Sequence, residues 1–317
     1  MNARTFLLLC VGAAVIGLLA FFAAPGKQTA KTEAQGPMLA GLDINAVTKL
    51  HITDGDDNIP LSLAEGVWSL EGLTGLPVDQ GKVRAFLLSL GSITIADVKT
   101  DNPALHDAVG LGDDAVRIDL GDKGILLGKD ASGGGRFGRR MGEDQSYVVR
   151  QVTRPQTDIK SWLKLDMPTI PAETVTKVET VIGGDAYTIE KDADGKPVLL
   201  GLGEDEALAY DTVLETVIGG AVYIDYESVR LAEGLNWANA DTSVFHGAQE
   251  GDTVRYSVAK DDDELLWLKA DPGGTLAPEG GLDWARYAFE ISDYRRGALI
   301  KPRTELLAAP DPESDPE

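Results

Sequence analysis

A partial internal repeat constrains the fold of this chain more than any other feature of its sequence. The tripeptide Val47-Thr48-Lys49 recurs 128 residues later as Val175-Thr176-Lys177. Each copy is followed, in the same order, by a strand-like run, an acidic or glycine-containing turn, a second run, another turn and a third apolar run. Self-similarity of this kind indicates a duplicated structural unit, so we expect a unit of about 125 residues to occur twice.

The two copies share further features downstream. An aspartate precedes a helix-like stretch in both, Asp79 before residues 83–90 and Asp211 before residues 213–218, which is typical of a helix N-cap. The remaining matches pair Gly110-Leu111 with Gly234-Leu235, residues 114–120 with 252–258, residues 125–127 with 265–268, and residues 147–149 with 287–289. This alignment leaves an insertion around residues 236–251 in the second copy.

Alternating apolar and polar residues indicate β-strands. Residues 116–120 read Val-Arg-Ile-Asp-Leu, the pattern of a strand with one wet face. Short Gly- or Asp-containing turns join most of the expected strands, which favours antiparallel hairpins. We predict an α+β fold: two tandem duplicated domains of mainly antiparallel sheet with short covering helices, at residues 43–170 and 171–307, after one N-terminal transmembrane helix.

The N-terminal apolar run predicts this transmembrane helix. No charged side chain lies between Arg4 and Lys27, and residues 6–24 are close to the ~20 residues that cross a bilayer as a helix. The alternative is a cleaved signal peptide, which has a shorter apolar core. We expect residues 1–26 to form the anchor, residues 27–42 a tether, and residues 308–317 a disordered acidic tail. Cys10 is the single cysteine, so no disulfide forms within one chain.

The same end of the chain indicates the compartment. Arg4 and the N-terminus are nearly balanced by Lys27 and Lys31, so charge alone does not set the orientation. An apolar run after a short basic start usually directs export of the downstream chain, and we expect a single-pass inner-membrane protein of a bacterium with residues 27–317 in the periplasm. The net charge of −22 argues against a nucleic acid partner.

Most chemical motifs are missing from the sequence. The three histidines, His51, His106 and His246, have no second histidine three or four residues away, so a helical zinc motif is absent. Gly-x-Ser-x-Gly is absent as well. We therefore predict no catalytic residue, no metal site and no cofactor. Dispersed Asp or Glu residues that meet only in three dimensions stay open as an enzymatic alternative.

A glycine-rich segment carries the most conspicuous basic cluster. Residues 133–138 satisfy Gly-x-Gly-x-x-Gly, but a dinucleotide loop must open a helix, and residues 139–149 look like a turn and a strand. A hairpin tip is the preferred interpretation. Arg136, Arg139 and Arg140 are candidates for contact with an acidic partner or lipid headgroups; the alternative is a local set of salt bridges with Glu143 and Asp144.

Three weaker patterns have structural interpretations. Asp54, Asp56, Asn58 and Glu65 match part of a calcium-loop template, but Ile59 replaces the required glycine and the flanks resemble strands. The acidic run at residues 261–264 connects two expected strands. A carbohydrate platform and a core role compete for the five tryptophans, and at strand positions the core role is commoner. They are Trp68, Trp162, Trp237, Trp267 and Trp284.

The order of these weak motifs resembles a bacterial membrane-anchored family, domain of unknown function 4340. The resemblance rests on the N-terminal anchor, Trp68-Ser69-Leu70, Gly110-Leu111, Leu126-Leu127-Gly128 and Tyr147-Val148-Val149. It covers residues 44–165 clearly and 173–305 more loosely, with Val198 near the place of the tryptophan. Some proteins resembling this family occur beside gliding-motility-type components that include ABC transporter subunits, and the resemblance supplies no catalytic residues.

Together these features favour a non-enzymatic interaction protein. We expect a membrane-tethered periplasmic protein, an auxiliary component of an envelope or ABC-type transport system, whose partner is another membrane or periplasmic protein. The first alternative is a periplasmic solute- or glycan-binding module. A carboxylate-dependent hydrolase is the less favoured alternative.

Overall fold

Two eight-stranded antiparallel sheets with few short helices form the body of the protein, which confirms the α+β prediction. The computed structural model describes residues 36–277 and 281–309. The first sheet has the order β3-β2-β1-β5-β6-β7-β8-β4 and the second β11-β10-β9-β13-β14-β15-β16-β12. Subtracting eight from each strand number of the second sheet reproduces the first, so the two sheets have one topology.

The first sheet is followed along the chain by the second with matching elements. Its strands are β1 (Lys49–Asp54), β2 (Asp57–Ala64), β3 (Val67–Leu70), β4 (Thr94–Val98), β5 (Val116–Asp119), β6 (Gly124–Asp130), β7 (Arg136–Arg140) and β8 (Ser146–Arg150). Helix α2 (Gln80–Gly91) lies between β3 and β4.

The second sheet repeats this order with a shorter helix at the equivalent place. Its strands are β9 (Lys177–Ile182), β10 (Asp185–Lys191), β11 (Pro197–Leu199), β12 (Val229–Leu231), β13 (Asp241–His246), β14 (Thr253–Lys260), β15 (Leu266–Gly273) and β16 (Tyr287–Ile291). Helix α3 (Val213–Ile218) lies between β11 and β12, and α4 (Asp293–Leu299) follows β16.

Strand topology corrects the middle of the sequence alignment. Strand β5 was matched to residues 252–258, which form β14, but its topological counterpart is β13. The match of residues 125–127, in β6, to residues 265–268 was wrong for the same reason. Residues 236–251 are therefore no insertion, because they contain β13. The pattern Thr-Val-Arg-Tyr-Ser-Val in β14 resembles β5 by chance alternation, a property that every half-buried strand shares.

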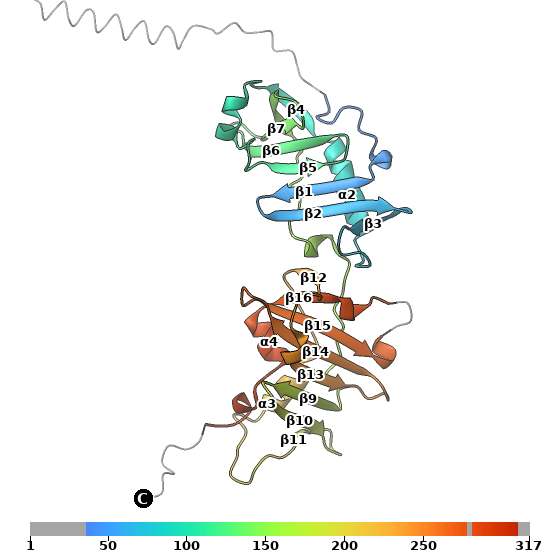
Figure 1. Cartoon of the computed structure of the whole chain (residues 1–317), viewed down its shortest axis with the longest axis vertical. Helices are drawn as coiled ribbons and strands as arrows, with labels where there is room; N and C mark the ends of the chain where they lie inside the picture. The colour runs from blue at the N-terminus through green and yellow to red at the C-terminus, as the bar shows by residue number, and fades with distance from the viewer. Residues whose placement is uncertain (1–35, 278–280, 310–317) are drawn as a thin grey trace, which may run out of the picture.

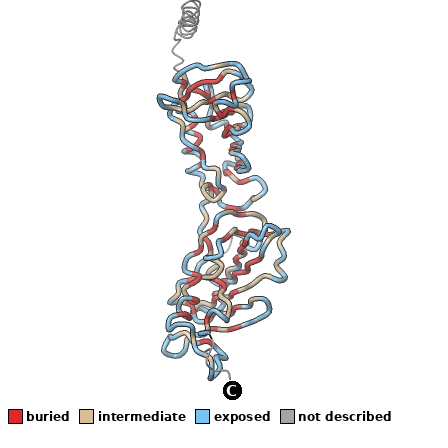
Figure 2. The backbone as a smooth tube through the Cα atoms, turned by 90° about the vertical axis from the view of Figure 1, so that its left-hand side faces the viewer, coloured by how far each residue is buried: buried red, intermediate tan, exposed pale blue. Residues whose placement is uncertain are grey.

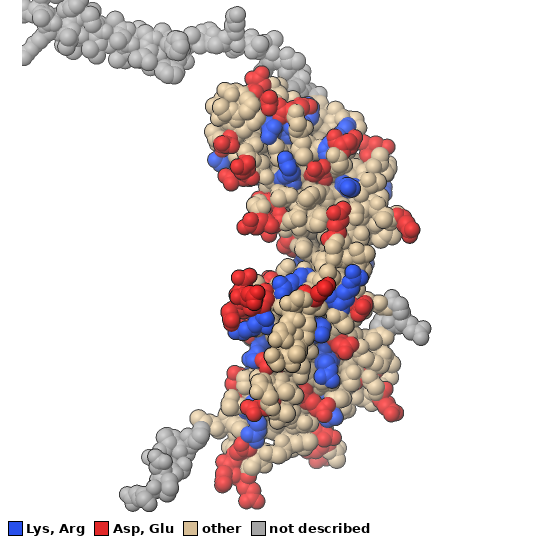
Figure 3. Space-filling model, viewed as in Figure 1, with Lys and Arg blue, Asp and Glu red and all other residues tan. Residues whose placement is uncertain are grey.

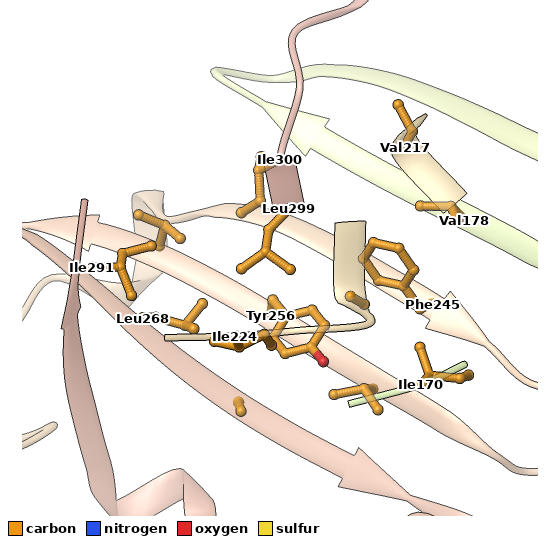
Figure 4. Packing of buried hydrophobic residues seen from close by; sticks show 14 of the residues in the cluster. Ile170, Val178, Val217, Ile224, Phe245, Tyr256, Leu268, Ile291, Leu299 and Ile300 are labelled. Atoms are coloured by element: carbon orange, nitrogen blue, oxygen red, sulfur yellow. The ribbon is translucent and has the colours of Figure 1, made fainter. Parts of the chain in front are cut away.

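Each sheet buries one face under its helices. Asp79 caps α2 as expected, since its carboxylate accepts the Lys82 N–H at 3.0 Å. The N-cap expectation at Asp211 was wrong: Thr212 occupies the N-cap of α3, without a side-chain capping bond. Figure 4 shows the second core, where residues of α3 and α4 lie over Phe245, Tyr256 and Leu268.

The chain enters the first sheet through a packed segment. Met38 and Leu39 are buried in the first core, and the Met38 N–H donates to the Ile93 carbonyl at 2.7 Å. The expected tether at residues 27–42 thus overlaps the folded body from residue 36 onward. The anchor at residues 1–26 lies outside the described residues, within which no helix is long and apolar enough to cross a membrane.

The sheets follow one another along the long axis, and the described chain begins near one end and finishes near the other (Figures 1 and 2). The β3 edge of the first sheet faces the β12 edge of the second. Leu76, from the loop after β3, is buried in the second core, and Leu73 packs against both cores. The boundaries 43–170 and 171–307 stay a prediction, since independent folding has not been tested.

Polar contacts fix this junction. The Tyr287 hydroxyl donates to the Thr74 carbonyl at 2.7 Å, and the Lys160 ammonium pairs with the Asp225 carboxylate at 2.5 Å. Gly75 has φ +109°, and a Cβ there would stand 2.9 Å from the Tyr287 hydroxyl oxygen. Two reasons therefore require glycine at this position: its backbone conformation and the close approach of the tyrosine.

Candidate functional site

The arginine cluster lies on one hairpin of the first sheet. Strands β6 and β7 form the hairpin, and Gly133, Gly134 and Gly135 in its turn all have positive φ. Strand β7, rather than a helix, follows the glycines. The expected hairpin tip is confirmed, and the geometry of a dinucleotide loop is excluded here because that loop places its ligand at a helix N-terminus.

All three arginines bond within the first unit, Arg139 through the Glu143 carbonyl at 2.7 Å. Arg136 donates to the Gly128 carbonyl through Nε at 2.9 Å and Nη2 at 2.7 Å. Arg140 donates to the Met38 carbonyl at 2.6 Å and to the Glu143 carboxylate at 3.1 Å, and its guanidinium lies 5.2 Å from the centre of the Tyr147 ring. The expected local pairing with Glu143 is therefore present at Arg140.

Arg139 lies on the outer face, away from the helix-covered core. Leu126 on β6 pairs with Arg139 on one side and with Arg117 of β5 on the other. Residues directly opposite one another in neighbouring strands point to the same face. The two arginines therefore flank Leu126, and with Asp113 they line a pocket of about 400 Å³.

A segment that crosses the outer face forms one wall of this pocket. Leu111 and Ala115 pack with Leu126 in a small apolar cluster. The backbone of Val109 and Gly110 crosses closely over Gly128, where a Cβ would collide with both carbonyl groups. In the second sheet, the segment containing Ala232 plays the same role over Trp267. The Gly-Leu pairs of the two copies thus belong to equivalent outer segments.

The histidines occupy three structural settings. His51 bonds the Asn58 side chain across the β1–β2 hairpin, and the buried His106 contacts the Asp144 carbonyl at 2.9 Å. His246 lies 2.6 Å from Glu179, which also pairs with Lys177. Burial raises the pKa of Glu179, but the hydrogen bonds from Lys177 and His246 outweigh this effect and the net pKa is lowered.

The calcium-loop residues do not converge. Asp54 and Asp56 lie at the β1–β2 turn, whereas Glu65 lies at the opposite end of β2 with φ +51°. Asn58 within β2 bonds to His51. Across residues 36–277 and 281–309, no group of three or more His, Cys, Asp or Glu side chains is arranged to hold a metal ion.

The acidic run and the tryptophans contribute to the fold. Asp261 accepts the Leu265 N–H at 3.0 Å and the Trp267 indole N–H at 2.7 Å, which organises the turn from β14 to β15. The tryptophans pack in or against the apolar clusters rather than on one open platform. Trp68, Trp162 and Trp267 are buried, whereas Trp237 and Trp284 are partly buried.

The largest pKa shifts also have structural causes. Arg303 and the Gly203 N–H hold the pKa of Glu206 at about 2. Burial, assisted by Asp225, raises the pKa of Tyr226 to about 12, and burial raises that of Tyr256. Acidic side chains are spread over both units, with basic ones among them, on the face shown in Figure 3. The shifted groups therefore mark ion pairs and core tyrosines, not one shared cluster.

Comparison with known protein families gives a match for this chain. The family model described as "Domain of unknown function (DUF4340)" matches residues 68–260, more than half of the 317-residue chain. The chain belongs to this family, as its motif order suggested. The match runs from β3 of the first sheet to β14 of the second. Neither the curated proteins nor the solved structures contain a match to the chain.

Sequence reasoning missed Arg117 as the neighbour of Arg139. The alternation of residues 116–120 places Arg117 on the polar face of its strand, and that was the available signal. Arg117 and Arg139 are 22 residues apart in sequence, and the registers of two hairpins bring them to the two sides of Leu126. No local pattern specifies which polar positions of different strands are aligned.

Proposed function

We propose that this protein is a membrane-tethered periplasmic interaction protein, without enzymatic activity, that serves as an auxiliary component of an envelope or ABC-type transport system. The apolar run at residues 6–24 supports the tether. The elongated body supports a role at a distance from the attachment point, since its described residues begin at one end and finish at the other.

The junction between the sheets carries the proposal. Strand registers place Leu70 and Leu199 at equivalent positions, and each is followed two residues later by a glycine with positive φ. The next residues are Leu73 and Leu202. Leu73 packs against both cores, whereas Leu202, at the free end of the second unit, is 39% exposed. The loop after the third strand is a docking element in this fold, and its second copy is open.

Other exposed apolar residues enlarge this free end. Val198, Leu200 and Tyr210 are each more than 40% exposed. Such residues in one loop region are characteristic of a protein-binding surface. The acidic residues Glu204 and Asp205 stand in the same loop. A mixed apolar and charged surface suits a partner that binds reversibly, because transient interfaces are more polar than permanent ones.

Site-specific crosslinking in the native membrane tests the proposal. A photoreactive amino acid at position 202 should capture one specific envelope or transporter protein after mild detergent extraction. The matched control is position 88 on α2, because Leu88 is a similarly exposed leucine, at 50%, in the first unit. Equal capture at both positions, or none at position 202 in cells that express the protein normally, contradicts the proposal.

The compartment is tested with a single introduced cysteine. Cys10 is the one natural cysteine, so a chain with Cys10→Ser and Ser132→Cys has one thiol, at an exposed hairpin tip. A membrane-impermeant maleimide should label it in intact cells with a permeabilised outer membrane. Labelling only after lysis of the inner membrane contradicts the periplasmic location.

A further inference from the structure

The pocket between Arg117 and Arg139 is the strongest candidate for a small ligand site. Arg117, Leu126 and Arg139 are consecutive cross-strand partners on β5, β6 and β7. Neighbouring strands are about 4.8 Å apart, so the backbones of the two arginines are separated by about 10 Å. Both side chains stand on the outer face, on either side of Leu126.

These cations are not neutralised inside the fold. Within the described ranges, the Arg117 side chain makes no hydrogen bond or ion pair. Arg139 donates to the Glu143 carbonyl at 2.7 Å, and its Nε is buried without a hydrogen-bond partner. Guanidinium groups without a carboxylate partner favour an oxyanion, because its charge and its oxygens match their N–H donors.

The charge and the volume of the pocket also suit a small anion. Asp113 also lines the pocket, so two guanidinium groups and one carboxylate give it one net positive charge in a chain of net −22. Thr53 also lines the pocket. A hollow of about 400 Å³ accepts a group of side-chain or small-metabolite size.

We propose that this pocket binds an oxyanion, a carboxylate or phosphate group, between the guanidinium groups of Arg117 and Arg139. The planar fork of each guanidinium matches two oxygens of either group. Asp113 weakens the site by repulsion and thereby keeps its affinity low. The inference is independent of the proposed docking of the free end, because it concerns the first unit alone.

The second sheet provides a matched control. Strand registers make Thr242, Ser257 and Lys269 the counterparts of Arg117, Leu126 and Arg139. The Lys269 ammonium lies 4.6 Å from the centre of the Trp237 ring and lines none of the pockets found near it. Lys269→Gln therefore removes the same charge from the same sheet position without touching the proposed site.

Calorimetric titration of the full chain in non-ionic detergent tests the site, with glutarate as the carboxylate probe and inorganic phosphate as the other. Saturable binding of either probe is expected, and the tighter one identifies the ligand class. Arg117→Gln and Arg139→Gln should each weaken binding about tenfold or more. Asp113→Asn should tighten it several-fold, and Lys269→Gln should leave it unchanged.

Three outcomes overturn the inference. These are no saturable binding of either probe, equal weakening by Lys269→Gln and Arg117→Gln, and weaker rather than tighter binding by Asp113→Asn. Arg117 is exposed and unpaired, so Arg117→Gln should retain the wild-type unfolding temperature. The Arg117→Gln variant therefore tests the site even if Arg139→Gln, which loses the contact with Glu143, fails to fold.

Discussion

The Glu206 carboxylate accepts two hydrogen bonds from the Arg303 guanidinium, at 2.7 and 2.6 Å. An isolated antiparallel bridge pairs Val78 with Leu163, and an equivalent bridge in the second unit pairs Leu208 with Leu307. Leu76 and Glu206 each lie two residues before the first member of their bridge. Arg303 and Ile159 each lie four residues before the second member of these bridges, so they are counterparts. Ile159 packs against both cores. An ion pair at the free end thus stands where apolar contacts join the units, beside the exposed apolar residues of that end.

This pair gives stability a specific dependence on pH. The pKa of Glu206 is lowered from 4.5 to about 2 in the folded protein, so its contribution is present above pH 4.5 and is lost as the pH falls towards 2. Over this window the unfolding temperature of the wild type should fall more steeply than that of Glu206→Gln. Glu204→Gln serves as the control; curves for Glu206→Gln and wild type that stay parallel contradict the assignment.

Leu76 should stabilise the second unit although it belongs to the first copy. It is 3% exposed and lies in the second core. Leu76→Ala should cost about 2–5 kcal/mol, because it leaves a cavity at the junction. Hydrogen exchange should show loss of protection in β12 and β16. Leu105→Ala, at a leucine that is 48% exposed, should stay within about 0.5 kcal/mol of the wild type. Loss of protection confined to the first sheet would count against this role.

The second unit should be less stable when it is separated from the first at the predicted domain boundary. A fragment of residues 171–309 lacks Leu73, Leu76 and the Thr74 carbonyl that the Tyr287 hydroxyl contacts. We expect it to fold with a lower unfolding temperature than the second unit has in the full chain. A fragment of residues 36–170 added in trans should restore part of the difference. Equal stability of the isolated and the connected unit would show that the junction contributes nothing.

A buried hydroxyl pair distinguishes the second sheet from the first. Thr180 and Ser243 are 2.7 Å apart and buried, at the places that Ile52 and Ile118 occupy in the first sheet. Thr180→Val should cost about 1–3 kcal/mol, since it leaves the Ser243 hydroxyl unpaired. The double variant with Ser243→Ala should recover stability, as measured by urea denaturation. Additive losses in the double variant would mean that the two hydroxyl groups do not stabilise each other.

Gly128 should be intolerant of any side chain. A Cβ there collides with the carbonyls of Val109 and Gly110, so Gly128→Ala must displace the segment over the outer face. Overpacking of this kind costs about 1–3 kcal/mol. Gly297 in α4 has open space around it, and Gly297→Ala should stabilise by about 0.5–1 kcal/mol. Thermal unfolding of both variants should show opposite signs; a neutral Gly128→Ala would contradict the close crossing.

Local patterns were sufficient for some elements and insufficient for others. The Asp79 cap and the hairpin around residues 133–135 were predictable from residue types at fixed offsets, which act over a few positions. Strand β13 was missed because alternation marks a strand without identifying its partner. The same ambiguity shifted the alignment of β5 and hid the approach of Arg117 to Arg139.

The sequence by itself determined the α+β class and the family, because both rest on the order and periodicity of short segments. Only the tertiary structure decided how the units meet and which loop stays open. Leu73 and Leu202 come after the same Gly-containing turn, yet one packs between two cores and the other is exposed at the free end. The physical reason is that burial depends on the groups that lie opposite a residue, and long-range packing, rather than local pattern, places those groups.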